Sequence, residues 1–106
     1  MIIVTTEQIP GREVVDTCGL VRGTTVRSRH MGLAIRAMMR ILVGGEIVEY
    51  TKLLAECREQ AIDRMTDEAH SMGADAIVGF RFVTMEVARG AAEIVAYGTA
   101  VTLVPK

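Results

Sequence analysis

The longest periodic pattern in the chain lies between residues 50 and 72, which contain neither proline nor glycine. Its apolar positions recur three and four residues apart, at Leu53, Leu54, Cys57, Ala61, Met65, Ala69 and Met72. This spacing predicts an amphipathic helix with one buried face, about 34 Å long at about 1.5 Å of rise per residue. Glu46 and Glu49 suit its positive N-terminal end, and Gly73 suits a left-handed residue at its C-terminal end.

Four segments rich in β-branched residues predict strands on either side of this helix. They are Met1 to Thr6, Val14 to about Val26, residues 76 to 86, and about Ala92 to Val104. In the second of them, Gly19 and Gly23 predict bulges or bends. Residues 29 to 43 form a shorter helical pattern, and a turn is expected at Arg89-Gly90. The order β-β-α-α-β-β predicts an α+β fold, in which the long helix packs on an antiparallel sheet.

The last two predicted strands are apolar on both faces. In the first, one face would carry Ala76, Val78, Phe80 and Phe82, and the other Ile77, Gly79, Arg81, Val83 and Met85. In the second, the alternating sets are Ala92, Ile94, Ala96, Gly98 and Ala100 against Val95, Tyr97, Val101 and Leu103. An antiparallel sheet with one solvated face should alternate apolar with polar residues, so both faces need a cover. The long helix covers one face, and we expect another subunit, or alternatively the short helix, to cover the second.

Composition restricts the classes of protein that the chain can belong to. Its 106 residues, half of them hydrophobic with a net charge of −1, fit one folded domain and give no overall basic field for nucleic acid. No apolar run approaches the roughly 18 residues of a membrane span, and the N-terminus lacks the pattern of a secretion signal. We therefore expect a cytoplasmic protein with no nucleic-acid or membrane partner.

Soft-metal ligands are few and isolated along the chain. They are Cys18, Cys57, His30 and His70, with no short local pair such as CxxC. Cys57 and His70 are about 140° apart around the helix axis, so they cannot share one ion within a subunit. Cys18 and Cys57 could meet if the second strand packs under the helix. The alternative is that both are reduced, buried thiols.

Carboxylates and an imidazole form a second candidate set, here called the acidic stripe. It consists of Glu56, Glu59, Asp63, Asp67 and His70, which fall within an arc of roughly 80° on the helix. Hard divalent ions accept oxygen ligands of this kind. The alternative is an ordinary solvated helix face, but in an oligomer the stripes of neighbouring subunits can converge.

Glu68 occupies an unusual place, in the middle of the apolar arc of the helix. Because burial without a partner is costly for a carboxylate, we expect it to pair with Arg64 or Arg81. A carboxylate in such a position can also be catalytic, and Glu68, His70 and Arg81 are the residues to test for an enzyme. The nucleotide-binding and hydrolase motifs GxGxxG, P-loop, GxSxG and HExxH are absent from the sequence.

Several segments together resemble a known family. They are GLVRG at 19 to 23, Gly44-Gly45 before EYTKLL, AECREQAIDRMTDEAHSMGADAIVGFRF, and the terminal YGTAV. This pattern, over nearly the whole chain, resembles the YbjQ-like family of small bacterial and archaeal proteins catalogued as heavy-metal-binding. The resemblance implies a single domain over residues 1–106, a dodecin-like two-layer subunit and a ring oligomer, specifically a pentamer. It brings no established catalytic residues.

Residues and resemblance together predict an oligomeric binding protein that holds a divalent or heavy-metal ion, or a small ligand, within a homo-oligomeric ring. The predicted metal ligands are Cys18, Cys57, His70, Asp63 and Asp67. The alternative is a structural or protein-interaction module with no ligand, and an enzyme ranks third.

Overall fold

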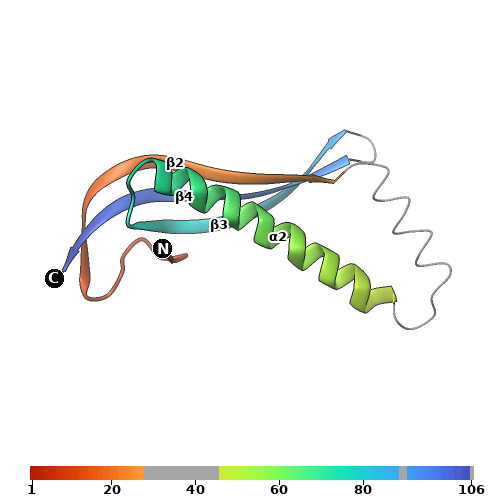
Figure 1. The fold of residues 1–106 in the computed structure, drawn as a ribbon, viewed down its shortest axis with the longest axis horizontal. Coiled ribbons are helices and arrows are strands. Elements are labelled where there is room, and N and C mark those ends of the chain that lie inside the picture. Colours follow the sequence, from red (N-terminus) through yellow and green to blue (C-terminus); the bar gives the residue numbers. More distant parts are fainter. Residues whose placement is uncertain (28–45, 89–90, 106) are drawn as a thin grey trace.

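The computed structural model describes residues 1–27, 46–88 and 91–105 (Figure 1). Its elements are β1 (Ile2–Ile3), β2 (Arg12–Arg27), α2 (Glu46–Ser71), β3 (Ala76–Ala88) and β4 (Ala91–Pro105). The expected α+β composition is confirmed. β2 extends beyond the predicted bounds at both ends, and α2 begins before its predicted start and ends one residue before its predicted end. The short helix predicted for residues 29 to 43 and the turn at residues 89 and 90 lie outside the described residues.

The four strands form one mixed sheet in the order β1-β3-β4-β2. β4 runs antiparallel to both β2 and β3, whereas β1 runs parallel to β3. Beyond β1, the N–H of Val4 donates to the carbonyl of Ile77 at 2.9 Å, which extends the contact with β3. The expectation of a wholly antiparallel sheet is therefore wrong, because β2 and α2 provide the long connection that parallel pairing of β1 with β3 requires.

A bulge in β3 changes which of its residues share a face. Val78 pairs with Thr99, but the next paired residue, Arg81, lies opposite Tyr97, so β3 carries one extra residue at this point. Gly79 has φ +63°, in the left-handed region that glycine adopts without strain. The predicted alternation therefore fails after Val78. The sheet face away from α2, here called the far face, carries Ala76, Val78, Arg81, Val83 and Met85, and the opposite face carries Ile77, Phe80, Phe82 and Thr84.

The helix α2 packs mainly over β2 and to a lesser extent over β4, and its N-terminal part diverges from the strands (Figure 1). The contact is closest at Gly23, where a Cβ atom would overlap the carbonyl oxygen of Ala61 and the nitrogen of Met65. Next to it, the Thr25 hydroxyl donates to the Cys57 carbonyl at 3.0 Å. Gly23 keeps a regular pairing with Ala96, so it is not the bend predicted from sequence. It is instead the position at which helix and strand backbones meet.

The predicted irregularity at the other β2 glycine is confirmed. The register of β2 against β4 shifts between Thr17 and Gly19, and Gly19 has φ +135°. A second shift lies between Val14 and Asp16. Because bulges bend and twist a strand, these two shifts account for the curvature of β2 toward its N-terminal end (Figure 1).

Two clusters of buried side chains hold the subunit together, one on each side of the sheet. The cluster beneath α2 consists of Val21, Ala61, Met65, Ala69, Ala74, Ile77, Ala96 and Ala100. The cluster on the far face consists of Ile9, Ala76, Val78 and Val101, with Ile2, Val4 and Leu103 packed against it. Residues 2 to 9, here called the N-terminal segment, therefore cover one part of the far face. The sequence had predicted that a second subunit or the short helix would cover it.

Gly73 ends α2 as predicted, in the left-handed conformation at φ +77°. The N–H of Gly73 donates to the His70 carbonyl at 3.0 Å, and the N–H of Ala74 donates to the Ala69 carbonyl at 3.1 Å. This pair of bonds is the Schellman arrangement, which satisfies carbonyls that the helix leaves unpaired. It also turns the chain directly into β3.

We expect the substitution Gly23→Ala to lower the free energy of unfolding by about 1–3 kcal/mol, because the added methyl group forces α2 away from β2. Chemical denaturation at a fixed protomer concentration measures this loss. Thr84→Ala, at an exposed position of β3, is the control and should change the stability by less than about 0.5 kcal/mol. Equal effects of the two substitutions would contradict the close packing at Gly23.

Candidate functional site

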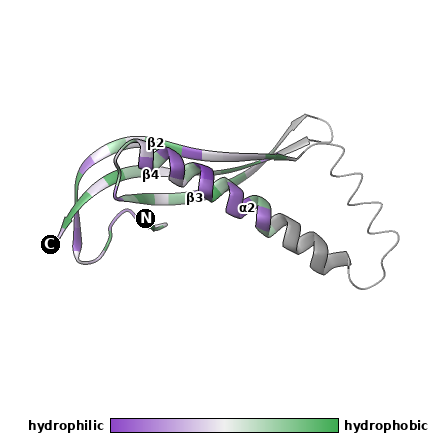
Figure 2. Cartoon of the chain, viewed as in Figure 1, coloured by the Kyte–Doolittle hydropathy of each residue, from purple (hydrophilic) through white to green (hydrophobic). Residues whose placement is uncertain are grey.

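The acidic stripe lies on an exposed face of α2. Asp63, Asp67 and His70 are all exposed, as are Glu56 and Glu59. Residues three and four apart on a helix have Cβ atoms about 5–6 Å apart, so Asp63, Asp67 and His70 are neighbours along the helix surface. Figure 2 shows hydrophilic positions along α2 and hydrophobic positions along β3 and β4. The structure therefore brings three of the five predicted metal ligands together on one open surface.

Cys57 lies on the opposite, buried side of α2. Its side chain is 6% exposed, and its backbone carbonyl accepts the hydrogen bond from the Thr25 hydroxyl of β2. A buried thiol in apolar surroundings behaves as a small hydrophobic group. The helix itself separates Cys57 from the acidic stripe, as the angular spacing predicted.

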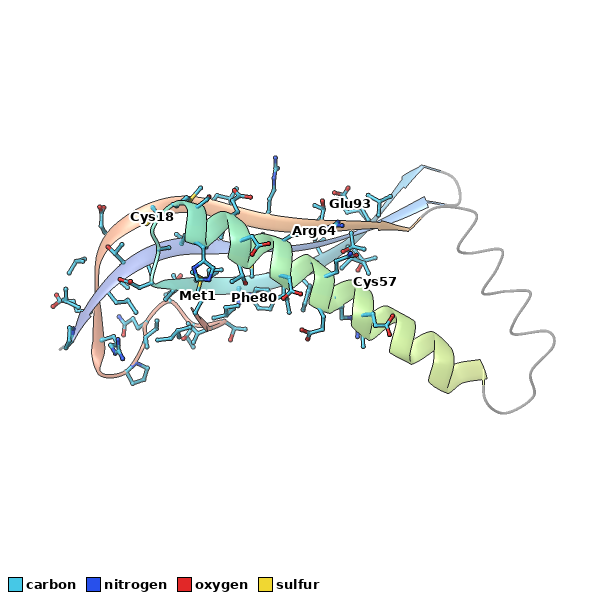
Figure 3. The ribbon with its side chains drawn as sticks, in the orientation of Figure 1. Met1, Cys18, Cys57, Arg64, Phe80 and Glu93 are labelled. Carbon is cyan, nitrogen blue, oxygen red and sulfur yellow. The ribbon has the colours of Figure 1, made fainter. Side chains whose placement is uncertain are left out.

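Cys18 is half-buried and packs against the cluster beneath α2. Figure 3 shows Cys18 near the C-terminal end of α2 and Cys57 far along the helix from it. Since Thr25 lies opposite Cys57, and Cys18 precedes Thr25 by seven residues of strand, the two cysteines are roughly 20 Å apart. The strand does pack under the helix as expected, but its register keeps the two thiols apart.

The five predicted ligands thus occupy three separate places in the subunit. Within residues 1–27, 46–88 and 91–105, no group of three or more His, Cys, Asp and Glu side chains is arranged to hold a metal ion. Asp63, Asp67 and His70 do share one face of α2, but that face is open to solvent. It lacks the enclosing ligand shell of a typical metal site in a protein. A metal site inside one subunit therefore does not fit the described residues.

Glu68 is half-buried on α2, but the two expected arginine partners bond elsewhere. The Arg64 guanidinium donates to the backbone carbonyl of Thr24. The Arg81 guanidinium donates through Nη1 to the carbonyls of Thr5 at 2.9 Å and Phe80 at 2.7 Å. Arg81 belongs to the far face, so the sheet stands between it and Glu68. The bulge at Gly79, which reverses the faces of β3, is the reason that this expected pair cannot form.

A hollow of about 1080 Å³ lies beside the N-terminal segment, and sequence reasoning missed it. We call it the N-terminal hollow. It is lined by residues 5 to 10, by Arg12, Glu13 and Val14 of β2, and by Arg81 of β3. Thr6 holds the segment in shape by donating its hydroxyl to the Gln8 carbonyl at 2.8 Å. The Pro10-Gly11 turn was the only local signal, because the hollow depends on how this segment docks against distant strands.

Beyond the N-terminal segment, the far face carries exposed apolar side chains interspersed with Arg22, Arg81 and Glu93, and it is uncovered by the described residues. The strand register places its residues in cross-strand rows, from Arg22, Tyr97 and Arg81 through Thr24, Val95 and Val83 to Val26, Glu93 and Met85. Leu20 is 63% exposed and Val26 is 57% exposed, and Val83, Met85 and Tyr97 are also exposed. This surface is about 20 Å long over three strands.

Comparisons of the sequence with known proteins found similarity over nearly the whole chain. A family model described as "Putative heavy-metal-binding" matches residues 1–104. A UPF0145 protein of Methanosarcina acetivorans is 52% identical over 103 residues, which cover 97% of each chain. A UPF0145 protein of Fervidobacterium nodosum is 53% identical over 103 residues, covering 97% of this chain and 95% of its own.

One solved structure has the same fold. It is the crystal structure of a protein of unknown function from Pediococcus pentosaceus, assigned to the DUF74 family, with a TM-score of 0.63 over 98% of each chain. The sequence identity is 18%, so this likeness concerns the fold alone. In the part of the chain described here, no helix is long and apolar enough to cross a membrane.

The two cysteines should differ in reactivity toward a thiol reagent. Because Cys57 is buried and Cys18 is half-buried, we expect Cys57 to react about tenfold or more slowly in the native protein, since its reaction requires local opening. Absorbance-monitored thiol titration resolves the two phases, and Cys18→Ser should remove the fast one. Loss of the slow phase in Cys18→Ser would contradict the placement of Cys57 in the core.

Proposed function

Because this chain belongs to the YbjQ-like family, which includes the UPF0145 proteins, we propose that it is an oligomeric binding protein holding a metal ion or a small ligand within a homo-oligomeric ring. The observation that carries this proposal is the uncovered apolar far face. The pentameric state, the dodecin-like architecture and the cytoplasmic location belong to the same proposal.

The far face supports self-association on physical grounds. Monomeric proteins rarely expose contiguous apolar surfaces larger than a few hundred Å², and such surfaces mark interaction sites. The chain is also elongated, with extents of 55 × 28 × 18 Å and a radius of gyration of 17.1 Å, against about 13 Å expected for a compact domain of this length. Packing of the far face on a different surface of the next copy is a heterologous contact, which generates a ring when the rotation closes.

A metal site is proposed between subunits, because the described residues do not form one within a subunit. Asp63, Asp67 and His70 supply carboxylate oxygens and an imidazole nitrogen on an open face, where a neighbouring copy can complete a coordination shell. Cys57 would have to leave the core to bind an ion, and Cys18 is available only near the C-terminal end of α2. The proposal therefore rests first on the acidic stripe.

The alternative is a structural or protein-interaction module that binds no ligand. The separation of the predicted ligands into three places favours it, since a resident ion normally holds its ligands together in the fold. Native mass spectrometry of untagged protein, with elemental analysis of the same sample, distinguishes the two functions. A ring that retains a stoichiometric ion after dialysis supports binding, and a ring without one supports the structural module. A monomer at micromolar concentration contradicts both.

Val83→Asp should weaken self-association on the order of a hundredfold, because it places an unpaired charge in the middle of the far face. Sedimentation velocity measures the shift toward smaller species. Ala55→Asp, at an exposed position of α2, introduces the same charge away from the far face and should leave the distribution unchanged. Both variants sedimenting like the wild type would exclude the far face as the interface.

Asp67→Asn should reduce the affinity for a retained divalent ion by about tenfold or more, since it removes a charged oxygen ligand from the acidic stripe. Isothermal titration of the metal-free ring with zinc or manganese measures this loss. The control is Glu7→Gln, an exposed carboxylate outside the stripe. If the two substitutions have the same effect, the stripe does not hold the ion.

A further inference from the structure

The N-terminal hollow has a fixed cation on its wall. Arg81 is held there by two hydrogen bonds from one guanidinium nitrogen, to the carbonyls of Thr5 and Phe80. An arginine side chain has five N–H donors, so these two bonds leave three, on Nε and the second terminal nitrogen. These donors form the planar fork that matches two oxygens of a carboxylate or phosphate group. The backbone bonds therefore hold Arg81 in a defined orientation and leave its fork for a ligand.

We propose that the N-terminal hollow binds a small molecule through a carboxylate or phosphate group held by the Arg81 fork. The inference rests on the small-ligand part of the proposed function and gives that ligand a chemical class and a location. It does not depend on the acidic stripe, which lies on α2 on the other side of the sheet.

Other residues around Arg81 add positive charge. Arg12 lines the same hollow, and Arg22 stands in the cross-strand row that contains Tyr97 and Arg81. Arg22 and Arg81 are two strands apart, so their Cα atoms are about 10 Å from each other. Three arginines thus surround this end of the far face and attract an anion to it.

The two carboxylates on the lining restrict which anion can bind. Glu7 and Glu13 lie on the wall of the N-terminal hollow with Arg12 and Arg81. A molecule that is anionic over its whole surface would be repelled by them, whereas one with a single anionic group and hydroxyl or amino groups elsewhere would find acceptors. The Thr5 and Thr6 hydroxyls and the Gln8 amide offer further hydrogen-bonding groups to a polar ligand.

The size of the hollow fits a small molecule rather than a macromolecule. Ligand pockets in proteins are typically about 300–1000 Å³, and this one, at about 1080 Å³, lies just above that range. Arg81, on a β-strand with two hydrogen bonds to backbone carbonyls, is a more rigid anchor than a residue on a free loop. The remaining volume accommodates the non-anionic part of the ligand.

The test is NMR titration of the whole protein with glycerol 3-phosphate and with glycerate, each of which has one anionic group and two hydroxyl groups. We expect saturable shifts of the Arg81 side-chain N–H signal and of the backbone amides of residues 5 to 14. Stronger binding of glycerol 3-phosphate than of glycerate identifies a phosphate ligand, and the reverse order identifies a carboxylate. Shifts that stay linear and spread over the surface with both probes overturn the proposal.

Variants separate recognition by Arg81 from its structural role. Arg81→Lys keeps the charge but lacks the fork, and it should weaken binding of the preferred probe by about tenfold. Arg12→Gln removes the other cation of the hollow while leaving the Arg81 bonds to the backbone in place, and should weaken binding about threefold to tenfold. The control Arg58→Gln, exposed on α2, should have no effect. Wild-type affinity in both hollow variants overturns the proposal.

This test is independent of the oligomer assay. A ring whose N-terminal hollow shows no saturable shifts overturns the anion site and leaves the proposed assembly standing. Saturable binding by a monomeric protein supports the anion site and overturns only the ring.

Discussion

The close contact between α2 and β2 at Gly23 is the constraint on which the rest of the subunit depends. The absence of a side chain there lets the helix backbone at Ala61 and Met65 approach the strand directly. This approach fixes the helix over β2, so that the Thr25 hydroxyl reaches the Cys57 carbonyl and the buried alanines of α2 meet those of β4. The same placement directs the acidic stripe to solvent and Cys57 into the core, and so decides which candidate ligands are accessible.

The position of the helix also determines how the sheet is used. Because α2 covers only one side of the sheet, the apolar residues of the far face need another cover, and the N-terminal segment covers only some of them. The N-terminal segment covers Ala76, Val78 and Val101, while the apolar rows beyond it stay open. The boundary between the covered and open parts passes through Arg81, which bonds to the N-terminal segment and stands beside Tyr97. The proposed interface and the proposed anion site are therefore neighbours on one face.

The candidate site was only partly predictable. The angular spacing on α2 correctly separated Cys57 from His70 and placed the stripe on one face, since helix geometry depends only on sequence position. The possible meeting of Cys18 with Cys57 depended on the register between strand and helix, which is set by a tertiary contact at Gly23. The N-terminal hollow and the role of Arg81 had no local signature, because their walls come from residues 5 to 14 and from β3, which are distant in sequence.

The sequence by itself determined the long helix, the three long strands, the C-terminal end of α2 at Gly73 and the excess of apolar surface on the sheet. Each of these follows from periodicity or from the conformational preference of a residue, and so can be derived without knowing the tertiary contacts. The family followed from the similarity of the sequence to known proteins. The tertiary structure alone decided the parallel pairing of β1 with β3 and the bulge that moves Arg81 to the far face. It also decided that Gly23 is the position at which the backbones of α2 and β2 meet. These depend on which distant backbones come together, and a one-residue shift in register is enough to reverse the face of every residue that follows.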